Sequence, residues 1–152
     1  MTTEQQFLEK AIMLAKENPI DEGSPFGAVL VKDGKIIAEG VNKVFATFDS
    51  TSHAELNALR IAEKKLKTTR LDSYEVYASG QPCPMCLAAM RMAGITKIVF
   101  AYSNKQAEPF GLSSQKVTDD LNSSIEKQTW ATIFHMNLDP EATLYKHWQT
   151  IK

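Results

Sequence analysis

The stretch Pro82-Cys83-Pro84-Met85-Cys86 lies where a predicted strand gives way to a predicted helix. A β-rich run, residues 74–78, precedes it, and Gly94 follows as a natural helix end. The two prolines suit a helix start, because the first helical N–H has no intrahelical acceptor. Residues 96–102 form a further predicted strand. A strand, a helix and a second strand in this order predict a crossover between parallel strands. A second crossover is predicted through the helix that ends near Lys67, so the middle strands of the sheet are expected to be parallel.

The flanking sequence continues the alternation of helices and strands. Thr3 and Gln6 match a capping box, so a first helix is predicted to run to about Asn18. N-cap candidates at positions 49–52 begin a second helix that ends near Lys67. The predicted strands are residues 28–31, 36–41, 74–78, 96–102 and 130–136, with a weaker helix near 115–122 and a last helix after Asp139-Pro140.

This order predicts an α/β protein with three layers, α/β/α, around a central mixed five-stranded sheet. The 152 residues fit one domain, residues 1–152. Formal net charge is −1, from 17 basic and 18 acidic residues, which argues against a nucleic-acid partner. The sequence has no basic segment followed by an apolar run at its start and no run long enough to span a bilayer, so we expect a cytoplasmic protein without a membrane partner.

His53, Cys83 and Cys86 are three candidate zinc ligands. With three protein ligands, the fourth tetrahedral position stays open, which is typical of a catalytic rather than a structural zinc. The spacing of the cysteines places both sulfurs on one side of a first helical turn, where free N–H groups favour thiolates. The chain is therefore expected to bind one Zn²⁺.

Glu55 is the candidate proton carrier. Positions i and i+2 of a regular helix point to nearly opposite sides, so His53 and Glu55 cannot both face a metal from mid-helix. They can do so if His53 lies at the helix entrance, where the backbone is not yet helical. Glu55 is then close to the metal without binding it.

His-x-Glu followed by Pro-Cys-x-x-Cys is the signature of zinc nucleobase and nucleoside deaminases, and the chain resembles this cytidine-deaminase superfamily. Ser24-Pro25-Phe26-Gly27-Ala28-Val29, Asn42 and the Pro-Cys motif are similar to the small bacterial guanine deaminases, over essentially residues 1–150. The resemblance implies hydrolytic deamination of a nucleobase, with Phe26 and Asn42 contacting the base. It also implies a backbone hydrogen bond from Ala54, proton transfer by Glu55, and a homodimer whose C-terminal segments cross to the partner.

The resemblance is incomplete around the base. Residues 87–92 lack an aromatic side chain, Gln81 replaces a glutamate that most relatives carry, and Leu112-Ser113-Ser114 has no acidic residue. The chain also ends soon after Trp148, without the family's aromatic tail. Guanine is the leading candidate substrate, and related aminated heteroaromatic rings remain alternative candidates.

Two alternatives remain. A tRNA-specific adenosine deaminase would use the same catalytic set, but it needs a basic rim, and the only tight basic run is Lys64, Lys65 and Lys67. Cys-x-x-Cys could instead belong to a dithiol redox protein or to a metal-binding module without catalysis. Metal analysis of the purified protein would distinguish this last class from the zinc deaminases.

Overall fold

The computed structural model describes residues 1–152. It contains two compact units, Met1–Asp119 and Asp120–Lys152, which are described separately. The larger unit holds every strand and all the candidate site residues. No helix in the structure has both the length and the apolar character needed to cross a membrane.

The larger unit is built on a four-stranded mixed sheet. Its strands are β1 (Gly27–Lys32), β2 (Lys35–Val41), β3 (Glu75–Gly80) and β4 (Lys97–Tyr102), in the order β2-β1-β3-β4. β1 runs antiparallel to both β2 and β3, whereas β3 and β4 are parallel. The crossover predicted around the Pro-Cys motif is confirmed by the parallel pair β3 and β4. The expectation that all the middle strands are parallel is wrong, because the hairpin strand β1 lies between β2 and β3 and is antiparallel to both.

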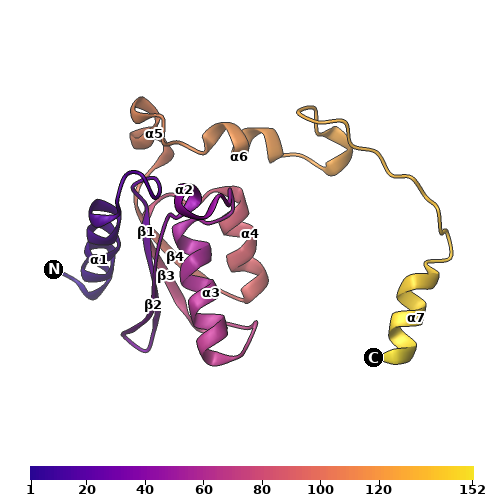
Figure 1. The fold of residues 1–152 in the computed structure, drawn as a ribbon, viewed down its shortest axis with the longest axis horizontal. Helices are drawn as coiled ribbons and strands as arrows, with labels where there is room; N and C mark the ends of the chain where they lie inside the picture. Colours follow the sequence, from indigo (N-terminus) through magenta and orange to yellow (C-terminus); the bar gives the residue numbers. More distant parts are fainter. The chain divides into compact units, whose positions relative to one another are not determined.

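Helices cover both faces of this sheet (Figure 1). Helix α1 (Thr3–Glu17) covers one face, and α3 (Ala54–Leu66) and α4 (Pro84–Ala93) cover the other. Successive residues of β1 point to opposite faces: Val29 packs on the α1 side, and Leu30 packs with α3 and α4. A strand buried on both faces explains the continuous apolar run of β1, and the three predicted layers are present.

The N-terminus of α3 lies directly on β2 at Gly40. A Cβ at this position would stand 2.1 Å from the carbonyl oxygen of Ala54, so only glycine permits the close approach. Because Ala54 is the first residue of α3, this packing fixes where the helix begins. The same packing therefore fixes the position of His53, the preceding residue, relative to the sheet.

The predicted helix ends are partly corrected. The capping box of α1 uses Thr2 and Gln5, one residue earlier than the predicted pair. The N-cap position of helix α3 is His53, whose side chain makes no capping hydrogen bond, and not one of the polar residues at positions 49–52. The prediction for α4 is confirmed, with a proline in its first turn and Gly94 in the left-handed conformation at its end.

The predicted fifth strand over residues 130–136 is wrong: the sheet has four strands. Trp130 and Phe134 give this segment β propensity, but both are more than half exposed. Strand preference depends on a partner strand and a surface to pack on, and residues 130–136 pair with no strand of the chain.

Short helices complete the chain. The sequence did not predict α2 (Val44–Thr47), α5 (Asn104–Ala107) or the 3-10 turn η1 (Glu108–Phe110), whereas α6 (Gln115–Leu121) matches the weaker prediction. The smaller unit contains the 3-10 turn η2 (Ile125–Lys127) and α7 (Thr143–Ile151). Helix α7 begins later than Asp139-Pro140, and the Asp139 carboxylate accepts hydrogen bonds from the N–H and hydroxyl of Thr143, both at 2.7 Å.

Candidate active site

Two helix N-termini bring the three candidate metal ligands together. His53 is the N-cap of α3 and Cys83 is the N-cap of α4, each with extended backbone. Cys86 lies in the first turn of α4, and its N–H donates to the Cys83 sulfur at 3.5 Å. The prediction that His53 lies at a helix entrance is confirmed. Both helix dipoles direct their positive ends toward this cluster and favour thiolates there.

The spacing of the donor atoms suits a zinc ion. Nδ1 of His53 lies 3.5 Å from the sulfur of Cys83 and 3.5 Å from the sulfur of Cys86. A tetrahedral ion with ordinary Zn–S and Zn–N bonds separates such a pair by about 3.6 Å. All three donor atoms lie within 4.8 Å of one another. The cluster therefore has the ligand types and the spacing of a three-ligand zinc site.

The two thiols are electrostatically unequal. The pKa of Cys83 is lowered to about 4, because its sulfur accepts hydrogen bonds from the Cys86 thiol, the His53 ring and the Cys86 N–H. The pKa of Cys86 is raised, first by its hydrogen bond to the Cys83 sulfur and then by burial. The pair thus holds one negative charge readily, and a bound dication is what allows both to be thiolates.

Glu55 is buried beside these ligands, with 7% of its surface exposed. Burial raises the pKa of its carboxyl group, and the negative Cys83 sulfur adds to the rise. The Cys86 thiol acts in the opposite direction and lowers the pKa of this carboxyl group, a smaller effect than that of burial, so the carboxyl group lies at the edge of the ligand cluster. A desolvated carboxylate in this position is typical of a group that exchanges protons during catalysis.

Phe26 and Ala54 lie together next to the ligand cluster. Phe26 packs against Ala28, Ala54 and Ala78, and Ala54 directly follows His53 in the chain. Ala54 is the first residue of α3, so its N–H has no acceptor within the helix. The structure therefore brings these two predicted substrate contacts to the N-terminal end of α3.

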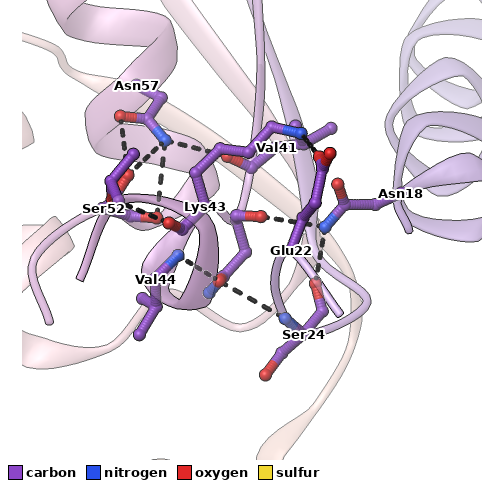
Figure 2. Close-up of polar contacts among 10 residues, drawn as sticks. Asn18, Glu22, Ser24, Val41, Lys43, Val44, Ser52 and Asn57 are labelled. Carbon is purple, nitrogen blue, oxygen red and sulfur yellow. Dashed lines mark hydrogen bonds and ion pairs between the residues drawn. The ribbon is translucent and has the colours of Figure 1, made fainter. Parts of the chain in front are cut away.

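Asn42 lies in a polar turn formed by residues 22–26 and 41–44; Figure 2 shows its neighbours Ser24, Lys43 and Val44 with the hydrogen bonds drawn around them. Its Oδ1 accepts from the N–H of Ser24 at 3.3 Å and from the N–H of Val44 at 3.1 Å. Its backbone N–H donates to the Phe26 carbonyl at 3.2 Å. Because Oδ1 is used by two backbone donors, the amide nitrogen is the end left to donate to a ligand.

Three residues that support this turn had no signal in the sequence. Asn18 donates to backbone carbonyls of the turn. Asn57, on α3, donates to the Val41 carbonyl at 2.8 Å and to the Ser52 hydroxyl at 3.1 Å. Gly23 packs against Asn42 so closely that a Cβ would lie 2.1 Å from the Asn42 carbonyl oxygen. Such contacts join segments distant in the chain, so neither periodicity nor a local motif reveals them.

Comparison with known proteins identifies relatives of this chain. Residues 1–102 match the model of the cytidine and deoxycytidylate deaminase zinc-binding region. The chain is 36% identical to guanine deaminase of Bacillus subtilis over 146 residues, covering 95% of this chain and 93% of that protein. The X-ray structure of the B. subtilis enzyme matches with a TM-score of 0.87 and 35% identity, over 96% of this chain and 93% of that one.

A second group of relatives covers less of the chain. The tRNA-specific adenosine deaminase of Aquifex aeolicus is 36% identical over 103 residues, which is 67% of this chain and 68% of that protein. The identity is the same as for the guanine deaminase, but the match covers 67% of this chain instead of 95%.

Proposed function

The chain belongs to the cytidine and deoxycytidylate deaminase zinc-binding family, and from this premise we propose that it is a guanine deaminase. It is a zinc-dependent hydrolytic deaminase with zinc as its cofactor. The proposed reaction converts guanine and water to xanthine and ammonia: water oxygen bonds to C2, and the exocyclic C–N bond breaks. The observation that carries the proposal is 36% identity to a guanine deaminase across 95% of the chain.

His53, Cys83 and Cys86 are the proposed ligands of one Zn²⁺ per chain. The spacing of Nδ1 and the two sulfurs supports this assignment. When bound, zinc lowers the pKa of a coordinated water to about 7 and so supplies a nucleophile at neutral pH. The thiolates are held at the N-terminus of α4, where the backbone N–H of Cys86 also stabilises the Cys83 charge.

Glu55 is the proposed proton carrier. Its carboxylate accepts the proton that water loses, delivers it to the ring nitrogen beside the reacting carbon, and then assists the departure of ammonia. Burial supports this role in two ways: it raises the carboxyl pKa toward the working range of an acid–base group, and it excludes bulk water.

Phe26, Asn42 and Ala54 are the proposed substrate contacts. Phe26 offers a face for stacking and packs against the buried cluster that includes Ala54. The backbone N–H of Ala54, the first residue of α3, has no acceptor within the helix. Asn42 presents its amide nitrogen, so it recognises an acceptor atom of the base, such as a ring nitrogen or a carbonyl oxygen. A few directional contacts of this kind suit a small flat ring.

We further propose a cytoplasmic homodimer of single-domain chains, in which the C-terminal segment crosses to the partner, as the resemblance to guanine deaminases implies. Helix α7 supports the swap, because Leu144, Trp148 and Ile151 are each more than half exposed and need a surface to cover. In this arrangement the last helix helps to enclose the substrate of the neighbouring chain.

A substrate screen tests the proposed function. Zinc-loaded protein is incubated separately with guanine, cytosine, adenine, a pterin, an aminotriazine and the matching nucleosides, and ammonia is measured. Guanine should give the fastest release, with xanthine as the second product, and a chelator should abolish it. Inosine formed in a tRNA anticodon stem-loop, with no free base or nucleoside deaminated, would replace the proposal with the tRNA enzyme.

A further inference from the structure

Asn18 lies outside every motif of the site, at the C-terminal cap of α1. Its side-chain amide nitrogen donates to the Ser24 carbonyl at 3.1 Å and to the Asn42 carbonyl at 2.9 Å, as Figure 2 shows. One amide group thus joins the segment that carries Phe26 to the segment that carries Asn42. Both acceptors are backbone carbonyls, so the link constrains the main chain of the two segments.

The side-chain oxygen of Asn18 is less well accommodated than its nitrogen. Oδ1 of Asn18 is buried and has no hydrogen-bond partner among the protein atoms. A buried acceptor without a partner costs free energy, and such groups are uncommon in folded proteins. Because of this cost, the stability of the fold alone does not explain an asparagine at this position. Its contribution is the pair of hydrogen bonds that its side-chain nitrogen donates.

Those two bonds act on the groups that orient Asn42. The carbonyl of Ser24 accepts from Asn18, and the N–H of the same residue donates to Oδ1 of Asn42. Asn18 therefore holds one of the two donors that fix the Asn42 amide, and it holds the Asn42 peptide as well. Ser24 is hydrogen-bonded directly to residues 41–44 only through Oδ1 of Asn42, and Asn18 adds a second connection because it bridges the Ser24 and Asn42 carbonyls.

We propose that Asn18 is a positioning residue for substrate binding, which fixes the Asn42 amide with its nitrogen toward the base and holds the Phe26 segment beside it. The inference rests on the proposed function, in which Phe26 and Asn42 contact the base. The hydrogen bonds of Asn18 reach neither Glu55 nor the three ligands. Its removal should therefore weaken substrate binding without slowing the chemical step or releasing the metal.

The test is Asn18→Ala in the full-length, zinc-loaded protein, assayed with guanine. KM should rise about tenfold, the factor carried by one correctly oriented hydrogen bond, while kcat stays within about threefold of wild type. Zinc should remain at one per chain. An unchanged KM, or a kcat that falls as far as KM rises, would overturn the inference.

A control variant of equal stability distinguishes the positioning role of Asn18 from a general loss of stability. Ile95 is buried in the core formed with α3 and α4, just before β4, and Ile95→Val removes one methylene there. At an equal drop in Tm, the control should leave KM unchanged. An equal rise in KM in the control would mean that Asn18 acts only through stability.

Crystal structures test the positioning role without any substrate. In wild type, Oδ1 of Asn42 should accept from both Ser24 and Val44, and in Asn18→Ala the Ser24 bond should be lost. If wild type shows no activity on guanine, the proposed function fails, and these two structures still decide the inference. An Asn42 amide in the same place in both would contradict it.

Discussion

Replacing Gly23 by alanine should displace Asn42 and weaken catalysis without touching the metal. A Cβ at position 23 would lie 2.1 Å from the Asn42 carbonyl oxygen, 2.5 Å from its Oδ1 and 2.6 Å from its carbonyl carbon. Ordinary van der Waals contact begins at 3.4 Å, so Asn42 must retreat by about 1.3 Å, the difference between the first distance and this limit. Two of the three nearest atoms belong to the backbone and cannot turn aside as a flexible side chain would.

The size of the effect follows from that displacement. A reacting or binding group moved by about 1 Å can cost roughly 100-fold in rate, so we expect kcat/KM for guanine to fall by about this factor. Overpacking should also cost about 1–3 kcal/mol of folding free energy. Zinc content should be unchanged, because the three atoms nearest to the added Cβ all belong to Asn42.

Steady-state kinetics with guanine, together with metal analysis and thermal unfolding, measure these effects. Gly34→Ala is the matched control: Gly34 has φ +75°, and a Cβ added there would have no atom within 4 Å, so alanine strains the turn without reaching the site. The control should lose about 1 kcal/mol of stability and keep its kcat/KM. A Gly23→Ala variant with wild-type kcat/KM would refute the placement of Asn42 in the substrate site.

Three further predictions concern the metal, the proton carrier and the tail. Cys83→Ala should lose stoichiometric zinc in elemental analysis and unfold at lower temperature, because ligand bonds contribute to folding; zinc retained at one per chain would exclude Cys83 as a ligand. Glu55→Gln should keep zinc and fold but lose about 10²- to 10⁴-fold in kcat, and a variant with more than about a tenth of the wild-type rate would remove Glu55 from proton transfer. Truncation after Asp139 should abolish most activity and dimer formation, measured by light scattering, while zinc remains; full activity of the shortened chain would refute enclosure by the C-terminal helix.

The parts of the fold that the sequence predicted are those fixed by local chemistry. Proline in the first turn and Gly94 at the end mark α4, and the i, i+2 spacing of His53 and Glu55 placed His53 at a helix entrance, as the structure confirms. The strands β1 to β4 follow from their apolar runs and turn residues.

The failures concern features that depend on partners distant in the chain. Residues 130–136 have the composition of a strand, but a strand forms only where another backbone pairs with it. Asn18 and Asn57 support the Asn42 turn through backbone carbonyls that folding alone brings within reach. An asparagine before a proline, or inside a helix, carries no sign of such a role in the sequence.

The most direct test of the central claim compares two substrates for one enzyme preparation. kcat/KM is measured for guanine and for adenosine in a tRNA anticodon stem-loop, with zinc at one per chain and with the Glu55→Gln variant as the blank. A guanine deaminase should release ammonia from guanine, form xanthine in equal amount, and leave the stem-loop unmodified. Deamination of the stem-loop with no xanthine formed from guanine would contradict the account.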